Sequence, residues 1–248
     1  MSKVTLNPLK IFDMKDHVVV ILNSPSIWSE VWKQIWNDSR INVCADGAAN
    51  KLMEMTKHGD YKMPKKIVGD FDSINKGTKE YFIEQGVSLI HVPDQNSPDI
   101  LKSLKNALID ADIDKHEYVV ILGGLCGRLD HTFQTVSILI RFYKEYQLDN
   151  VFVYDGCNLL TIINEGETEL DFSDHPEFLT KMCGVIPICQ RETIVTSTGL
   201  QYDMDSRQLA FGHLVSSSNR IMEDKVTIKT NAPANQTFDH CISYVNSL

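Results

Sequence analysis

Residues 117–139, EYVVILGGLCGRLDHTFQTVSIL, begin with an apolar run, turn through three glycines and continue with apolar residues spaced as on one face of a helix. A strand that leads into a helix through a tight turn is half of a βαβ unit. Such units build parallel sheets. This stretch therefore predicts an α/β fold.

The same alternation extends over the first 150 or so residues. Apolar side chains recur at helical spacing over 28–36, 100–108 and 133–143. The runs between them predict strands at 17–23, 41–46, 65–70, 87–92, 117–124 and 150–155. Because these strands are nearly continuously apolar, we expect a mostly parallel, doubly wound sheet with helices on both faces.

After residue 156 the pattern changes to short β-rich runs broken by Gly, Asn, Asp and Ser, without helical periodicity. The runs are 158–163, 182–189, 192–198, 208–215, 225–230 and 240–245. Closely spaced short strands predict a smaller antiparallel sandwich or barrel. The sequence therefore predicts two domains, 1–156 and 157–248.

Composition excludes several classes of protein. The 248 residues are 43% hydrophobic and 23% charged, and the net charge of −9 comes without a basic stripe, so we expect no nucleic-acid partner. No apolar run is long enough for a signal peptide or a membrane span. The six cysteines are scattered without a C-x-x-C pair, which favours reduced thiols. We therefore expect a cytoplasmic protein.

Acidic residues gather where the predicted strands end. They are Asp46, Asp70, Asp72, Asp94 and Asp155, with Asp99 shortly after Asp94. Ligands of open parallel sheets bind outside these carboxyl ends, where so many carboxylates would repel one another without a cation. Oxygen ligands without nearby His or Cys favour Mg²⁺.

Asp70 and Asp72 would share a face if strand geometry continued through Phe71. Alternatively, GDFDS is only a turn, since Gly, Asp and Ser dominate turns. Asp99 also has a local explanation, in the first turn of a helix with Ser97 as N-cap and Pro98 at the first position. A side chain in this first turn can also point toward the ligand site expected at the strand ends.

The glycine-rich turn at 123–127 is a candidate phosphate site. Glycines let backbone N–H groups approach an anion, and the helix expected to begin near Asp130 adds favourable partial charge. Arg128 can bind a phosphate through two hydrogen bonds. The turn matches neither the Walker A nor the dinucleotide pattern. An ordinary tight connection is the alternative, with Arg128, Asp130 and His131 facing solvent.

Several motifs in this order resemble thiamin pyrophosphokinases of the eukaryotic type. They are CADGAAN (44–50), IVGDFDSI (67–74), DQNSPDILKSL (94–104), GGLCGRLDHTFQTVSIL (123–139), TSTGLQYD (196–203) and LAFGHLVSSSNRI (209–221). The resemblance implies an α/β catalytic domain that binds ATP and Mg²⁺, a β-sandwich domain that binds thiamin, and a homodimer with thiamin between subunits. It also implies transfer of the pyrophosphoryl group of ATP to the hydroxyethyl oxygen of thiamin, which releases AMP.

By position, the resemblance also assigns site residues. The catalytic residues would be Asp46, Asp70, Asp72 and Asp99, with Asp70, Asp72 and Asp99 as metal ligands. The ATP and phosphate residues would be Asn23, Gln95, Lys102, Gly123, Gly124, Gly127, Arg128 and Asp130. Ser218 and Asn219 would contact thiamin. The chain departs from the family pattern at Pro98, where relatives have Thr, and at Gln236, where animal relatives have Trp.

Two other functions fit parts of the pattern. A D-x-D sugar-nucleotide transferase also uses metal-binding acids at strand ends, but it leaves the SSSN segment unexplained. A non-catalytic sensor that binds thiamin or a nucleotide would fit the altered residue at 236. The presence of all four matching aspartates favours the enzyme.

Overall fold

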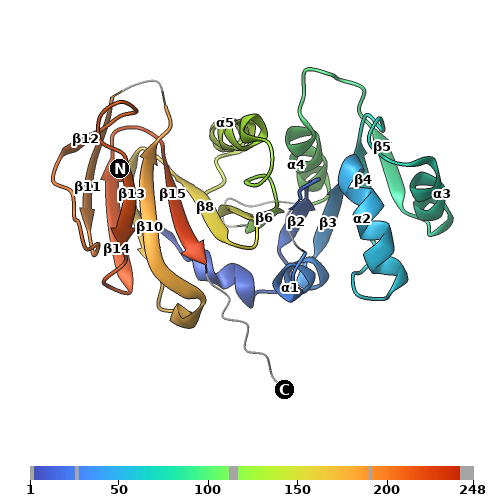
Figure 1. The fold of residues 1–248 in the computed structure, drawn as a ribbon, viewed down its shortest axis with the longest axis horizontal. Coiled ribbons are helices and arrows are strands. Elements are labelled where there is room, and N and C mark those ends of the chain that lie inside the picture. Colours follow the sequence, from blue (N-terminus) through green and yellow to red (C-terminus); the bar gives the residue numbers. More distant parts are fainter. Residues whose placement is uncertain (1–2, 26–27, 112–116, 190–191, 241–248) are drawn as a thin grey trace. The chain divides into compact units, whose positions relative to one another are not determined.

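The computed structural model describes residues 3–25, 28–111, 117–189 and 192–240. The chain forms two compact units, Ile11–Gly156 and Met1–Lys10 together with Cys157–Leu248 (Figure 1). Among the described residues, no helix combines the length and apolar character that a bilayer span requires.

A parallel six-stranded sheet forms the centre of the first unit. In chain order its strands are β2 (Val18–Ile21), β3 (Ile41–Ala45), β4 (Lys66–Gly69), β5 (Ser88–His91), β6 (Val119–Leu122) and β7 (Val151–Tyr154). In space they lie in the order β7-β6-β2-β3-β4-β5, and every neighbouring pair is parallel. All residues of β2, β3, β6 and β7 are buried, as expected for strands covered on both faces.

Five helices connect these strands: α1 (Glu30–Asp38), α2 (Asp46–Lys57), α3 (Lys76–Glu84), α4 (Asp99–Asp110) and α5 (Leu129–Tyr146). A 3-10 turn, η1 (Pro8–Phe12), precedes β2. The Ser29 side chain caps α1, whose apolar stripe buries Trp32, Ile35 and Trp36. α1 and α4 lie on opposite sides of strands β2 and β3 (Figure 1). The predicted doubly wound α/β fold is confirmed.

The strand order reverses direction beside β2. The chain steps from β2 through β3 and β4 to β5 at one edge, and then continues on the other side of β2 with β6 and β7. Ligands of doubly wound sheets bind at such a reversal, outside the carboxyl ends of the two strands. Here those ends lead into Asn23 and into the glycine-rich turn.

The second unit contains two layers of strands. One layer has the order β1 (Val4–Leu6), β9 (Gly166–Asp171), β14 (Lys225–Thr230), β11 (Thr193–Thr198) and β12 (Arg207–Leu209). The other has the order β13 (Ser216–Arg220), β10 (Leu179–Pro187), β15 (Ala234–His240) and β8 (Asn158–Ile163). A 3-10 turn, η2 (Pro176–Phe178), precedes β10. Apart from β1 with β9, the paired strands are antiparallel, which confirms the β-rich C-terminal domain.

The structure differs from the predicted boundaries at the N-terminus. Residues 1–10 group with the second unit rather than the first, because β1 pairs in parallel with β9. A three-residue strand whose partner lies some 160 positions away leaves no periodic signal. In the run 208–215, only the first two residues belong to a strand, and the backbone then turns through a hydrogen bond from Ala210 N–H to Leu214 C=O. The predicted run 240–245 lies outside the described residues except for His240.

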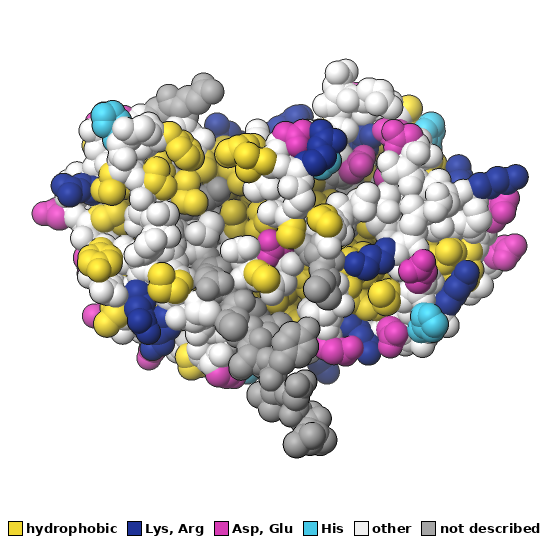
Figure 2. Space-filling view, in the orientation of Figure 1, with side chains coloured by type: hydrophobic (Ala, Val, Ile, Leu, Met, Phe, Trp, Pro, Cys, Tyr) yellow, Lys and Arg dark blue, Asp and Glu magenta, His cyan; other side chains and the backbone are white. Residues whose placement is uncertain are grey.

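Large apolar side chains reach solvent on the second unit. Figure 2 shows apolar atoms gathered over this part of the molecule, on the left. The exposed residues include Met182, Tyr202, Phe211, Leu214 and Met222. Exposed apolar patches are typical of interaction sites.

Candidate functional site

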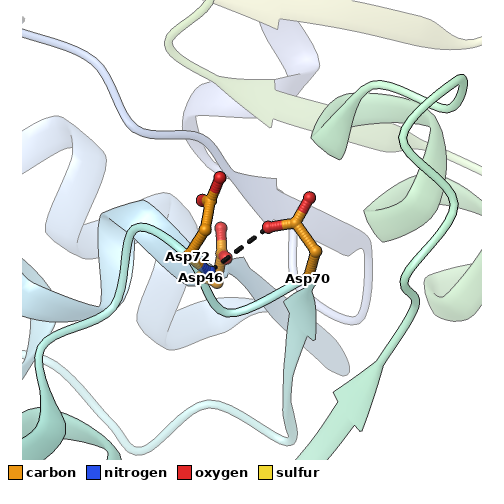
Figure 3. Close-up of side chains that lie close together, drawn as sticks. All are labelled: Asp46, Asp70 and Asp72. Atoms are coloured by element: carbon orange, nitrogen blue, oxygen red, sulfur yellow. Dashed lines mark hydrogen bonds between the residues drawn. The ribbon is translucent and has the colours of Figure 1, made fainter.

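Three carboxylates from two strand ends come together in the first unit (Figure 3). Asp46 follows β3, and Asp70 and Asp72 follow β4. One carboxylate oxygen of each residue lies within 4.8 Å of the other two. This acidic cluster, defined as Asp46, Asp70 and Asp72, is a candidate metal centre, because a cation would offset the mutual repulsion.

The loop after β4 is a turn, so strand geometry does not continue through Phe71, and this condition for Asp70 and Asp72 to share a strand face is not met. Phe71 adopts a left-handed conformation, with φ of 66°. The Asp72 N–H donates to Asp70 Oδ1 over 3.3 Å, which closes the turn (Figure 3). The Phe71 ring stacks on His91, with 5.4 Å between ring centroids. The turn itself brings the two carboxylates together, so the turn and the acidic cluster are not alternatives.

Asp46 is the buried member of the acidic cluster. It is fully buried at the start of α2, where its Oδ1 accepts the Gly47 N–H over 2.7 Å and its Oδ2 accepts the Phe71 N–H over 2.8 Å. Burial and repulsion from Asp99 raise the pKa of Asp46, while the two backbone hydrogen bonds oppose this. Asp46 therefore ties the end of β3 to the loop after β4.

Close packing at Asp46 explains the glycine that ends β4. A Cβ added at Gly69 would lie 2.4 Å from Asp46 Cγ and 2.7 Å from Asp46 Cβ. Neither distance is possible without a shift of buried atoms. Asn50, one turn after Asp46 on α2, holds the other end of the loop: its amide donates to Ser73 C=O and accepts the Asn75 N–H.

Lys102 and Gln95 both contact the cluster. Asp70 Oδ2 accepts Lys102 Nζ over 3.1 Å and Gln95 Nε2 over 3.2 Å. Lys102 Nζ also lies 3.5 Å from Asp99 Oδ1, and its side chain is only 2% exposed. The hydrogen bond from Lys102 lowers the pKa of Asp70. Burial alone would lower the pKa of Lys102, but Asp70 and Asp99 raise it overall, so Lys102 is charged.

Asp99 lies beside the cluster but outside it. Its side chain is 45% exposed at the first position of α4. Burial chiefly raises the pKa of Asp99, helped by repulsion from Asp70 and opposed by Lys102. The predicted metal ligands were Asp70, Asp72 and Asp99. The structure groups Asp70 and Asp72 with Asp46 instead of Asp99. The expected Ser97 cap is also wrong, because Pro98 is the N-cap and Ser97 Oγ donates to Asp94.

Asp99 allows a test of these electrostatics. In chelator-treated protein, Asp99→Asn is expected to raise the unfolding temperature at pH 7 by about 1–2 °C. The folded-state pKa of Asp99 is raised, so its stabilising contribution is complete below the ordinary Asp pKa and is lost as pH rises through the raised value. The neutral amide avoids this loss. Thermal unfolding near pH 4 and at pH 7 measures it, and a variant less stable than wild type at pH 7 would contradict the assignment.

The other two strand-end acids have partners of their own. Asp94 is exposed and accepts hydrogen bonds from Asn96 N–H and Ser97 Oγ. Asp155 is buried and accepts the Cys126 thiol, with 3.8 Å between Sγ and Oδ2. Neither belongs to a metal-competent group among the described residues.

The glycine-rich turn has the conformation that its glycines allow. Gly123, Gly124 and Gly127 have φ of 91°, 90° and 91°, in the left-handed region. A Cβ at Gly123 would lie 2.7 Å from Ser24 Cβ, so this turn packs closely against the loop after β2. These glycines therefore bring the backbone at the end of β6 against the loop after β2, at the point where the strand order reverses.

Arg128 and Asp130 stand at the start of α5. Arg128 is the N-cap residue, and the helix begins at Leu129, one residue before the expected position. The guanidinium donates twice to Asp130, over 3.1 Å to Oδ1 and 2.6 Å to Oδ2. Both side chains are exposed, so this pair contributes little to stability and is accessible to a ligand.

The loop after β2 packs against the glycine-rich turn through Ser24 and against the start of α2 through Asn23. A Cβ at Gly47 would lie 2.7 Å from Asn23 Nδ2. The amide of Asn23 therefore packs against the start of α2, one residue from Asp46. The predicted nucleotide residues and the predicted acids thus approach each other within the first unit.

The residues assigned to thiamin lie on β13 of the second unit. Ser218 is exposed, whereas Asn219 is buried and hydrogen-bonds to the backbone N–H and C=O of Tyr202. Asn219 therefore holds the backbone at Tyr202 in place. Gln236 on β15 is fully buried, and neither atom of its amide has a hydrogen-bond partner in the described structure.

Sequence reasoning did not single out Gly69, Asn50 or His91. Asn50 lies four residues after Asp46, and this spacing places both on one helix face, so a signal existed. Gly69 and His91 carry no local signal, because their contacts are made across neighbouring strands.

Comparison with known families matches both units. Residues 32–150 match the model described as thiamin pyrophosphokinase, catalytic domain, and residues 167–234 match thiamin pyrophosphokinase, vitamin B1 binding domain. Thiamin pyrophosphokinase 1 of Caenorhabditis elegans is 38% identical and covers 94% of this chain and 93% of its own. Thiamine pyrophosphokinase 1 of Oryza sativa subsp. japonica is 29% identical over 80% of this chain and 78% of its own.

Solved structures share the fold. Thiamin pyrophosphokinase from Candida albicans superposes with a TM-score of 0.82 at 24% identity, covering 97% of this chain and 94% of its own. The yeast thiamin pyrophosphokinase also gives 0.82, at 21% identity, with 98% and 92% covered. Together with the two matched domains and the 38% identical relative, these likenesses show that the chain belongs to the thiamin pyrophosphokinase family.

Proposed function

We propose that this protein transfers the pyrophosphoryl group of ATP to the hydroxyethyl oxygen of thiamin, producing thiamin diphosphate and AMP. One observation carries the proposal: in a chain of this family, three carboxylates from neighbouring strand ends lie within 4.8 Å. A glycine-rich turn lies at the reversal of strand order with an exposed arginine beside it. These features support the proposal that a nucleotide binds next to the carboxylates.

The donor set fits Mg²⁺. All three groups are hard carboxylate oxygens, and Asp72 is exposed, which leaves room for the waters and phosphate oxygens that Mg²⁺ keeps. We infer that Asp70 and Asp72 hold the ion, with either Asp99 or Asp46 adjacent to it. When bound, Mg²⁺ would neutralise phosphate charge.

Arg128 and the amides of the glycine-rich turn would stabilise the remaining charge on the phosphates. The Arg128 fork is presented to solvent and held by the exposed carboxylate of Asp130, which a phosphate group can replace. Asn23 and Gln95 would provide neutral donors. Fixed donors of this kind act mainly by positioning the reactants.

A carboxylate near the attacking hydroxyl group would accept its proton. The two candidates are Asp46 and Asp99, and both have a raised pKa. Asp46 is fully buried with both oxygens engaged by backbone N–H groups, whereas Asp99 is partly exposed. These contacts favour Asp99 as the general base.

The second unit would bind thiamin. The matched vitamin B1 binding domain, residues 167–234, contains both Ser218 and Asn219. The exposed apolar residues of this unit suit the surface of the predicted homodimer. The dimer and the cytoplasmic location stay predictions.

An AMP-release assay tests the function. Purified protein is incubated with ATP, with and without thiamin and with and without Mg²⁺, and AMP and thiamin diphosphate are measured. We expect AMP to form only when both thiamin and Mg²⁺ are present. Tight thiamin binding without AMP would favour the sensor, and activity with sugar nucleotides would favour the transferase.

Arg128→Lys is expected to raise the ATP KM roughly tenfold, because a point charge cannot reproduce the two parallel hydrogen bonds of the guanidinium. The pair with Asp130 is exposed, so the unfolding temperature is expected to stay the same. Steady-state kinetics with varied ATP and saturating thiamin measure the effect. An unchanged KM would remove Arg128 from the phosphate site.

A further inference from the structure

Lys102 provides the only ion pairs that the strand-end acids of this site make among the described residues. Its ammonium contacts Asp70 at 3.1 Å and Asp99 at 3.5 Å. Asp46 and Asp72 lie beside Asp70, with one carboxylate oxygen of each of the three residues within 4.8 Å of the other two. Because Lys102 is almost completely shielded from water, solvent and salt screen its charge poorly.

The contacts also restrict how Asp70 can bind a metal ion. Oδ2 of Asp70 accepts both Lys102 Nζ and Gln95 Nε2, which occupies its two lone pairs. Oδ1 accepts the Asp72 N–H and keeps one free lone pair. The carboxylate is therefore oriented, and a single oxygen position remains for an ion.

We propose that Lys102 is a positioning residue that orients Asp70 and opposes the binding of a free divalent cation, so that the metal binds tightly only together with the triphosphate. The phosphates supply the negative charge that Lys102 cancels within the protein. This inference rests on the proposed function, because it assumes that these carboxylates hold the metal of a nucleotide-dependent enzyme.

The burial of Lys102 separates this role from the phosphate contact that the family resemblance implies. A lysine that binds phosphate presents its ammonium to the ligand, whereas this ammonium lies against Asp70 and Asp99 with its side chain 2% exposed. The loss of a phosphate ligand would change nucleotide affinity, and the loss of a buried counter-charge would change the affinity for metal alone.

The test measures Mn²⁺ binding to nucleotide-free full-length protein by electron paramagnetic resonance of the free ion. Lys102→Gln keeps a donor for Asp70 but removes the charge, and Lys102→Met removes both. Each is expected to bind Mn²⁺ roughly tenfold or more tightly than wild type, because a nearby positive charge is gone. Lys102→Arg, which keeps the charge, is expected to stay within about threefold of wild type.

The matched control is Lys105→Gln, on the same helix but paired with Glu145 away from the cluster. It is expected to bind Mn²⁺ like wild type. Circular dichroism confirms that each variant is folded, and Lys102→Gln remains the deciding variant if Lys102→Met does not fold. Unchanged or weaker Mn²⁺ binding by folded Lys102→Gln overturns the proposal.

A second measurement adds a non-hydrolysable ATP analogue. The analogue is expected to increase Mn²⁺ affinity much more in wild type than in Lys102→Gln, since only wild type needs the added negative charge. An equal increase in both proteins overturns the proposal. No thiamin is used, so a wild-type protein that fails to form AMP with thiamin would refute the proposed function without changing this result.

Discussion

Asp72→Asn is expected to lower the turnover of AMP release roughly 10²–10³-fold while the protein stays folded. Asp72 is the most exposed member of the acidic cluster, and its carboxylate accepts Ser73 Oγ over 2.7 Å. The Asn side chain has the same shape and keeps an oxygen for Ser73. It loses the negative charge, which is the property a Mg²⁺ site requires.

The measurement combines AMP release at saturating ATP and thiamin with thermal unfolding. Asp94→Asn is the matched control, since Asp94 is another exposed acid at the end of a neighbouring strand but outside the cluster. Its turnover is expected to stay within a few-fold of wild type. Near-normal turnover of Asp72→Asn with Mg²⁺ would remove the cluster from the mechanism.

Gly69→Ala is expected to destabilise the protein by about 1–3 kcal/mol and to reduce turnover about as much as Asp72→Asn. Gly69 does not require a left-handed backbone, so the penalty comes from the contact alone. The added methyl group would overlap Asp46, whose buried carboxylate holds the Gly47 and Phe71 N–H groups. Displacing Asp46 would release the loop that carries Asp70 and Asp72.

Gly77→Ala is the control for glycine replacement in general. Gly77 lies on the exposed side of α3, and nothing lies within 4 Å of an added Cβ. This variant is expected to be neutral or more stable by up to about 1 kcal/mol. Chemical unfolding and AMP release on both variants give the comparison. If Gly69→Ala behaves like Gly77→Ala, the contact between Gly69 and Asp46 has no functional weight.

Sequence patterns predicted the first unit well, for a reason visible in its strands. All six predicted parallel strands are present, each ending within two residues of the predicted position. Four of them, β2, β3, β6 and β7, are buried throughout, and a strand buried on both faces must be continuously apolar. The helices α2 and α3 were missed. α2 buries Gly47, Ala48 and Ala49, and such small residues produce a weak apolar stripe.

The acids at the strand ends were also predictable, since parallel strands place their carboxyl ends at one edge. The prediction that they gather is correct for Asp46, Asp70 and Asp72. Asp94 and Asp155 do not belong to this cluster, because they hydrogen-bond to partners of their own. Whether a carboxylate at such an edge faces its neighbours depends on loop hydrogen bonds that apolar periodicity does not encode.

The sequence by itself determined the fold class, the order of the strands along the chain and the edge at which the acids lie, because burial imposes a local period on the residues. The tertiary structure alone decided the left-handed turn at Phe71, the burial of Asp46 against Gly69 and the ammonium of Lys102 beside two carboxylates. Each of these includes a contact between segments that are distant in the sequence, such as Asp46 with Phe71 or Lys102 with Asp70, and steric exclusion and charge act across these contacts only after the sheet has formed.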